Sequence, residues 1–319
     1  MRVLVAMSGG VDSSVAAALL KEQGFEVIGA TMQLWFDPKA EEEAKEKGKG
    51  CSSMAAVADA RQVCNVLGIP HHVFNFRDLF NETVVSYFMR EYKRGRTPNP
   101  CVVCNRYIKF AHFLRKAEAL NCEYMATGHY ARRVKDLLQE LFLLKKARDQ
   151  EKDQTYMLYC LTQHQLSKVL FPLGDLHKSE VRALAKKYGL PVSQKKESQD
   201  ICFIPNNNYR DFISRMSYSP SREGPIIDLQ GKKVGVHKGL EFYTIGQRKG
   251  LGLAFSEPVY VVDIIPERNT IKIGPAEALY SKGLELEDVN YITSPVTDAT
   301  KIEVKIRYRS PLHKAILYP

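Results

Sequence analysis

The sequence predicts an α/β protein in which helices cover a parallel sheet, followed by a small helical domain and a β-barrel-like domain. Over the first 130 residues, short apolar strands alternate with helical patterns, as in parallel sheets with right-handed crossovers. The pattern then turns helical, and beyond Gly224 short β-rich runs alternate with Gly, Pro and Asn turns, which is typical of small barrels. We therefore expect domains over residues 1–162, 163–217 and 218–319.

The elements follow in order along the chain. In the first domain we expect strands over residues 2–7, 26–34, 71–76 and 124–127 and helices over 13–23, 52–67, a stretch ending at Tyr92, and 107–120. Gly24 and Gly189 should end the first helix and a basic helix over 178–188. The Glu- and Lys-rich segment 39–49 is expected to be a solvated helix or loop. In the third domain we expect strands over 258–264, 270–273 and 301–308.

The composition narrows the function classes. The 319 residues are 45% hydrophobic and 26% charged, and the longest stretch without a charge, residues 154–167, is too short and too polar to span a membrane. The first residues contain no signal-peptide core, so we expect a cytoplasmic protein that needs no membrane. The net charge of +10 favours a polyanionic partner such as nucleic acid. Seven cysteines without a secretory signal indicate thiol chemistry or metal binding.

The strongest local motif follows the first expected strand and opens the first expected helix. It reads Ser8-Gly9-Gly10-Val11-Asp12-Ser13. Small residues let backbone N–H groups close around a phosphate, and the helix N-terminus adds a favourable dipole. Because the motif lacks the lysine of a Walker loop, we do not expect a kinase-type site. It resembles the PP-loop of the ATP pyrophosphatases, which transfer AMP to a substrate oxygen. A Rossmann-like sheet and Mg²⁺ at Asp12 are then expected.

Two thiols follow a proline-stiffened segment, Thr97-Pro98-Asn99-Pro100-Cys101-Val102-Val103-Cys104-Asn105. We expect a loop that presents both thiols before a helix, with Arg106 and Lys109 favouring the thiolate. A third thiol, Cys202, lies in an apolar run, where a buried structural role is equally expected from the sequence.

Together these motifs resemble the tRNA-specific 2-thiouridylases, which replace the C2 oxygen of the wobble uridine with sulfur. Further matching segments cover almost the whole chain: Thr127-Gly128-His129-Tyr130, Lys152-Asp153-Gln154, Gly246 to Gly252, and Arg307-Tyr308. The resemblance implies ATP-dependent adenylation of uridine O2, then transfer of sulfur from a persulfide on Cys202. Cys104 would be the second catalytic cysteine and would leave a Cys104–Cys202 disulfide. A cysteine desulfurase or a sulfur-relay protein would supply the sulfur.

The resemblance also assigns binding residues. ATP would be bound by Ala6, Met7, Ser8, Gly9, Gly10, Val11, Asp12, Ser13, Met32 and Gly128. The anticodon arm of tRNA would be bound by Asn99, Pro100, Cys101, His129, Lys152, Asp153, Gln154, Arg307 and Tyr308. Cations that track phosphate and aromatic or amide groups that meet unstacked bases suit this task.

The sequence departs from the family pattern at two places. Cys101 replaces an Asp that many members carry, so Cys101, Cys104 and Cys202 are an alternative ligand set for a 4Fe-4S cluster that activates sulfide. The sequence also ends at Pro319 within the expected barrel, where family members usually continue with further strands and a tRNA-contacting Gln, so we expect a truncated barrel.

Other functions remain open at this point. A PP-loop ligase that forms amides or guanidines would need no cysteine pair, and a noncatalytic RNA-binding module would need no PP-loop. The 2-thiocytidine and 4-thiouridine enzymes are closer alternatives. Four cysteines, Cys51, Cys64, Cys122 and Cys160, are expected to pack as small hydrophobes. His71 and His72 should face opposite sides of a strand in structural roles.

Overall fold

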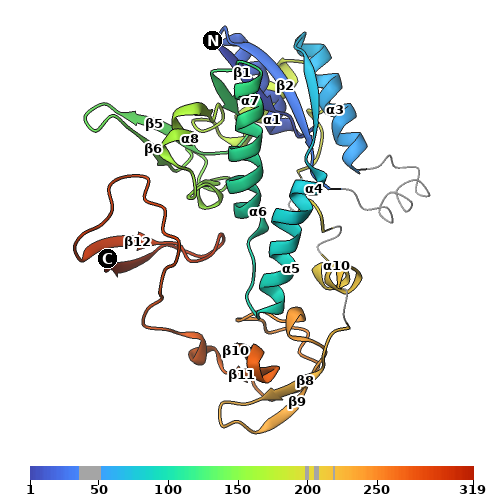
Figure 1. Ribbon diagram of the computed structural model, residues 1–319, viewed down its shortest axis with the longest axis vertical. Helices are drawn as coiled ribbons and strands as arrows, with labels where there is room; N and C mark the ends of the chain where they lie inside the picture. The colour runs from blue at the N-terminus through green and yellow to red at the C-terminus, as the bar shows by residue number, and fades with distance from the viewer. Residues whose placement is uncertain (36–51, 198–200, 205–207, 218–219) are drawn as a thin grey trace. The chain divides into compact units, whose positions relative to one another are not determined.

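A computed structural model describes residues 1–35, 52–197, 201–204, 208–217 and 220–319 (Figure 1). The structure does not describe Cys51, segment 39–49 or residues 198–200 before Cys202, so the predictions made for them lie outside the described residues. The chain divides into two compact units. Unit 1 comprises Met1–Phe80, Cys101–Gln199 and Val289–Pro319, and unit 2 comprises Asn81–Pro100 and Asp200–Asp288. Each unit is described by itself, and the division into three domains stays a prediction.

Unit 1 is built on a five-stranded parallel sheet. Its strands are β1 (Arg2–Ala6), β2 (Glu26–Gln33), β3 (His71–Asn75), β4 (Tyr124–Ala126) and β7 (Val169–Leu170), in the order β3-β2-β1-β4-β7. Every neighbouring pair runs parallel. The predicted parallel sheet is thus confirmed, together with four of its strands. The fifth, β7, lies where the sequence predicts only helix, because two residues are too few to show a periodicity.

Helices flank this sheet. They are α1 (Val11–Glu22), α3 (Ser52–Leu67), α4 (Arg77–Phe80), α7 (Leu114–Ala119), α8 (Gln163–Lys168) and α9 (Lys178–Lys187). Gly24 follows α1 with φ +84° and Gly189 follows α9 with φ +63°, as expected of glycines that end helices. No helix in the described part of the chain is long and apolar enough to cross a membrane.

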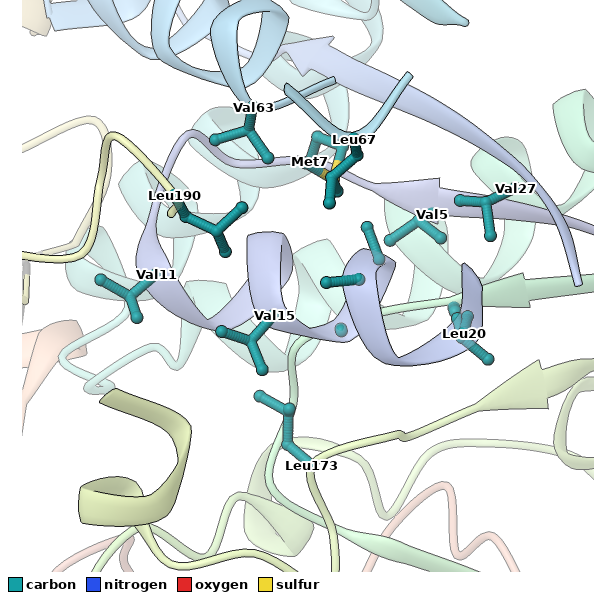
Figure 2. Packing of buried hydrophobic residues seen from close by; sticks show 14 of the residues in the cluster. Val5, Met7, Val11, Val15, Leu20, Val27, Val63, Leu67, Leu173 and Leu190 are labelled. Atoms are coloured by element: carbon teal, nitrogen blue, oxygen red, sulfur yellow. The ribbon is translucent and has the colours of Figure 1, made fainter. Parts of the chain in front are cut away.

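The core of unit 1 joins α1, α3 and α9 to one face of the sheet. Val5 and Met7 on the β1 side meet Val15 of α1 and Val63 and Leu67 of α3, as Figure 2 shows. The other face of β1 is buried as well, since Leu4 is 0% exposed. A strand buried on both faces reads as a continuous apolar run, which is why the sequence predicts β1 so well.

The helix expected over residues 107–120 begins earlier and changes type. Its segments are α6 (Pro100–Val103), a π-helix over Cys104–Phe113 and then α7. Proline fits the first turn of a helix because its missing N–H would have no partner there. The prediction that Cys101 and Cys104 lie in a loop is therefore wrong: both lie within the helix. A π-helix, with i→i+5 hydrogen bonds, is rare and often marks a functional segment.

Two hairpins complete unit 1. β5 (Arg132–Asp136) pairs with β6 (Leu141–Lys145), and β12 (Thr300–Val304) pairs with β13 (His313–Leu317). The first hairpin is not among the predicted elements. The strand predicted over residues 301–308 is too long, because Arg307 and Tyr308 lie in the turn after β12.

Unit 2 contains a four-stranded sheet and helices from two parts of the chain. The strands are β8 (Gly224–Ile227), β9 (Lys233–His237), β10 (Tyr260–Ile265) and β11 (Thr270–Gly274), in the order β10-β11-β8-β9. The helices are a π-helix (Asn81–Val85), α5 (Ser86–Lys93) and α10 (Tyr209–Met216). Short 3₁₀ turns occur in both units, at Thr155–Met157, Leu240–Phe242, Pro266–Arg268 and Ala276–Leu279. The predicted β-rich end is confirmed, although β8 and β11 pair in parallel.

Candidate active site

The candidate site of unit 1 lies where the parallel strands end. β1 pairs with β2 on one side and with β4 on the other, so the chain leaves β1 at a point where the strand order reverses. Open α/β sheets bind ligands beyond the carboxyl ends of strands at such a point. The Ser8–Ser13 loop follows β1, and Gly128 and His129 follow β4.

The loop is shaped by its own hydroxyls and by a glycine. The backbone N–H of Ser8 donates to Ser13 Oγ over 3.2 Å, and Ser14 Oγ donates to the Gly10 carbonyl over 2.7 Å. Gly9 has φ +70°, and a side chain there would also collide with the carbonyl of Ala56. Because Gly10 is the N-cap and has no side chain, α1 begins without a side-chain cap. Its first N–H groups can then serve a phosphate.

Gly128 brings the end of β4 against the start of α1. A Cβ at Gly128 would lie 2.7 Å from the Ser13 nitrogen and 2.8 Å from the Asp12 carbonyl carbon. Three of the predicted ATP residues, Ala6, Met7 and Val11, are buried in the core, so their side chains pack against protein and only their backbones can serve a ligand. The half-buried Met32 lies near the end of β2.

Asp12 is held by two side chains that are distant in the sequence. Lys178 Nζ donates to both carboxylate oxygens, at 2.6 and 2.8 Å, and Tyr130 Oη donates to Oδ1 at 2.9 Å. Burial and then the charge of Asp12 raise the pKa of Tyr130, so its hydroxyl stays protonated as a donor. The sequence does not indicate this role of Lys178, because Lys178 lies 166 residues from Asp12.

Glu197 is the centre of a group of cations next to Asp12. Its carboxylate lies 2.8 Å from Lys152 Nζ, 2.9 Å from Lys178 Nζ and 3.6 Å from a guanidinium nitrogen of Arg182. Desolvation alone would raise the pKa of Glu197, but the hydrogen bonds from the two lysines and their charges lower it to about 2. Lys178 thus joins the loop after β1 to Glu197, and no local spacing in the sequence indicates this.

The predicted tRNA residues of unit 1 have clear structural contacts. Lys152 pairs with Glu197, Asp153 accepts from the Ala147 nitrogen over 2.8 Å, and Gln154 Oε1 accepts from the Tyr130 nitrogen over 3.0 Å. The Tyr308 ring lies 6.0 Å from the Tyr156 ring. Burial raises the pKa of Tyr308, the charge of Asp153 raises it further, and the charge of Lys152 lowers it. The structure therefore brings the segment at 152–154 close to Tyr308, while Arg307 is exposed in the same turn.

Cys104 is a buried thiol at the start of the π-helix. It is 6% exposed, and burial raises its pKa, while the positive charge of Lys109 opposes the rise. The sequence prediction that the surroundings favour the thiolate is therefore wrong in its net direction. Arg106 does not act on Cys104. Its guanidinium lies 5.3 Å from the Tyr107 ring centre, and its charge lowers the pKa of Cys160.

His129 lies close to the same π-helix. Its Nδ1 is 2.7 Å from Thr127 Oγ1, and its ring packs against Phe110 and Phe171 at 5.8 and 6.4 Å between centroids. Burial and then the charge of Lys109 lower the pKa of His129 well below its ordinary value. His129 is therefore a neutral imidazole at neutral pH.

Cys202 lies in unit 2, on a segment fixed by its neighbours. Cys202 is exposed, whereas Phe203 and Ile204 are each 1% exposed. The Phe203 ring lies 5.4 Å from Phe88 and 5.2 Å from Phe212. The alternative of a buried structural cysteine is thus wrong, and the apolar run serves to hold an exposed thiol. Asn99 and Pro100 also belong to unit 2, and Cys101, which is exposed, belongs to unit 1.

Three of the four cysteines expected to pack as small hydrophobes are confirmed, and the fourth, Cys51, lies outside the described residues. Cys64, Cys122 and Cys160 are buried, and burial raises the pKa of both Cys64 and Cys160 to about 11. His71 Nε2 lies 2.9 Å from Thr31 Oγ1, and His72 is exposed. Within the described ranges, no group of three or more His, Cys, Asp or Glu side chains is placed to hold a metal ion.

Comparison with known proteins identifies the family. A family model described as "tRNA methyl transferase HUP domain" matches residues 1–206, and one described as "tRNA methyl transferase PRC-barrel domain" matches residues 210–275. A Natranaerobius thermophilus protein named tRNA-specific 2-thiouridylase MnmA is 51% identical over 100% of this chain and 87% of its own length. The chain belongs to the tRNA-specific 2-thiouridylase family. A Clostridium botulinum (strain Okra) relative, MnmA 2, is 52% identical over 100% of this chain and 88% of its own length.

Among solved structures, an NMN synthetase from Francisella tularensis aligns with a TM-score of 0.37 and 17% identity, over 62% of this chain and 66% of that one. Membership of the 2-thiouridylase family confirms the resemblance on which the sequence analysis relied. Use of ATP by a PP-loop is consistent with the uncapped helix and the glycine-shaped loop after β1.

Proposed function

We propose that this protein is a tRNA-uridine 2-sulfurtransferase that uses ATP to convert the wobble uridine of tRNA to 2-thiouridine. The observation that carries the proposal is 51–52% identity along the whole chain to relatives named tRNA-specific 2-thiouridylase. The loop after β1 and the thiols Cys104 and Cys202 provide the two chemistries that the reaction needs. The ligase alternative gives no reason for the thiols, and the RNA-binding alternative gives none for the loop.

The reaction begins with activation of a poor leaving group. Uridine O2 attacks the α-phosphate of ATP, so that O2 carries AMP and pyrophosphate leaves. The N–H groups that begin α1 and the lysines near Asp12 stabilise the phosphate charge. We assign ATP to the loop and to Met32 and Gly128. Asp12 would hold Mg²⁺, which would neutralise phosphate charge, and Lys178, which donates to Asp12, would add a positive charge beside the phosphates.

Sulfur transfer follows in two steps. The terminal sulfur of a persulfide on Cys202 attacks C2, and AMP leaves with the oxygen. The thiolate of Cys104 then attacks Cys202 Sγ, which breaks the sulfur–sulfur bond, releases 2-thiouridine and forms a Cys104–Cys202 disulfide. A two-electron thiol reductant resets the pair. The exposure of Cys202 suits loading by a cysteine desulfurase or a relay protein, which we propose as the donor.

The tRNA contacts belong to the same proposal. Lys152, His129, Arg307 and Tyr308 would meet the anticodon arm, together with Asn99, Pro100 and Cys101. Asp153 and Gln154 would meet the anticodon arm as well, on a segment held by the hydrogen bonds that they accept from the backbone nitrogens of Ala147 and Tyr130. The wobble base must leave its stack, at a cost of a few kcal/mol.

Nothing in the structure supports an iron–sulfur cluster, since the residues that it describes contain no group of three or more His, Cys, Asp or Glu side chains placed to hold a metal ion. We therefore derive no step through a cluster.

The test uses protein purified without oxygen. Iron and sulfide are measured first, and the protein then receives ATP, a sulfur source and unmodified tRNA, with 2-thiouridine detected by mass spectrometry of nucleosides. Cys104→Ala and Cys202→Ala should each abolish thiolation and retain ATP binding. Cys122→Ala is the matched control, since it removes a buried thiol at the opposite end of β4. Turnover by either of the first two variants, or loss of turnover in the control alone, would contradict the proposal.

A further inference from the structure

The π-helix of unit 1 changes which side chains share a face. In an α-helix, five residues advance the chain by about 500°, so residue i+5 lies about 140° away from residue i. In a π-helix the i→i+5 hydrogen bond closes each turn, so residue i+5 lies above residue i. Cys104 and Lys109 are five residues apart in the π-helix over Cys104–Phe113. Lys109 and Cys104 thereby share one face of the helix, one turn apart.

Two side-chain hydrogen bonds hold the π-helix in this register. Asn105, which is 1% exposed, donates from Nδ2 to the Met157 carbonyl over 2.7 Å. Gln165 of α8 donates from Nε2 to the Phe110 carbonyl over 2.8 Å. Both bonds join the π-helix to other segments of unit 1, so the placement of Lys109 is set by tertiary structure.

Lys109 itself is half-buried and has no acidic partner. Within the described ranges it makes no hydrogen bond and no ion pair. Its positive charge lowers the pKa of three groups, Cys101, Cys104 and His129. Burial of a lysine without an anion is costly, and an anion formed at Cys104 would compensate that cost.

We propose that Lys109 is a positioning residue for sulfur transfer, whose ammonium group stabilises the thiolate of Cys104 when the thiol gives its proton to solvent. This rests on the proposed function, in which the Cys104 thiolate attacks Cys202. His129 stays neutral beside Lys109 and so adds no second positive charge. Without Lys109, the pKa of the buried Cys104 thiol would be higher still.

Other titratable and charged groups lie on the elements next to the π-helix. Cys101 lies one turn before Cys104. The other groups are Arg77 and Asp78 on α4, which contacts the π-helix, Arg115, Lys116 and Glu118 on α7, which continues it, and His164 and Lys168 on α8, which Gln165 joins to it. Cys101 raises the pKa of Cys104, so it opposes the effect of Lys109.

The test measures the thiol and needs no tRNA. The rate at which iodoacetamide alkylates Cys104 is compared between variants at several pH values from about 7 to about 9, below the raised pKa of the thiol, and tandem mass spectrometry separates Cys104 from Cys101. In Lys109→Gln the pKa of Cys104 should rise by about one unit, so alkylation slows about 10-fold at each pH. Lys109→Arg should retain the wild-type rate. Lys116→Met, which removes the same charge from α7, should also leave the rate unchanged.

An unchanged alkylation rate in Lys109→Gln, or an equal slowing in Lys116→Met, would overturn the proposal. If Lys109→Gln proves too unstable to measure, Lys109→Met is compared with Lys109→Arg instead. Thiolation supplies the second readout: its rate in Lys109→Gln should recover as pH rises, which a structural defect would not do. Failure of the proposed function would appear as turnover in Cys104→Ala, whereas failure of this inference appears in the alkylation profile alone.

Discussion

Glu197→Gln removes the negative charge at the centre of the group of cations beside Asp12. The protein should become less stable, and the loss of stability should depend on pH. In the folded protein the pKa of Glu197 is about 2, compared with an ordinary value of 4.5. This difference corresponds to about 3 kcal/mol at neutral pH. The side chain is 27% exposed, so solvent screening reduces the expected loss to about 2 kcal/mol.

The direction of the pH dependence follows from the lowered pKa. Between about pH 2 and pH 4.5 the unfolded chain binds more protons at Glu197 than the folded chain does, so this contribution grows with pH. It is fully present above about pH 4.5 and is lost as pH falls towards 2. The difference in unfolding free energy between wild type and Glu197→Gln should therefore be constant from neutral pH to about 4.5 and should shrink below it.

Urea denaturation at several pH values, followed by circular dichroism, measures this difference. Glu151→Gln is the matched control, because Glu151 is exposed one residue from Lys152 and should change stability by less than about 0.5 kcal/mol. The reasoning fails if Glu197→Gln unfolds like the control at neutral pH. It fails equally if the loss of stability persists undiminished at about pH 3.

Two further substitutions test the fold around the nucleotide site and around the Cys202 thiol. Gly128→Ala should weaken ATP binding about 10-fold, measured by calorimetry, because its Cβ would lie 2.7 Å from the Ser13 nitrogen and overpacking costs about 1–3 kcal/mol. The control is Gly283→Ala, whose Cβ would have no atom within 4 Å and which should bind ATP normally. Equal affinities of the two variants would refute the close approach at Gly128. Phe88→Ala should destabilise unit 2 by about 3–5 kcal/mol, because Phe88 lies 5.4 Å from the Phe203 ring and 6.0 Å from Phe212. Faster hydrogen exchange confined to unit 2 is the expected signature, and unchanged exchange at residues 201–204 would show that this cluster does not hold the Cys202 segment.

The sequence by itself determined the parallel sheet, the loop after β1 and the family. These features are local: a buried strand reads as an apolar run, a glycine turn stands directly before a helix, and each thiol lies in a short motif. The limits of α3 and the glycine ends of α1 and α9 were predicted for the same reason.

Only the tertiary structure decided which distant side chains meet. Lys178 reaches Asp12 from 166 residues away, and Glu197 gathers two lysines and an arginine, because packing of α9 against α1 joins segments that no spacing relates. The π-helix was likewise undetectable, since one sequence fits either helix and only contacts with Met157 and Gln165 fix its register. Burial, which raises the pKa of Cys104 against the sequence prediction, is a property of the folded surroundings and not of the motif.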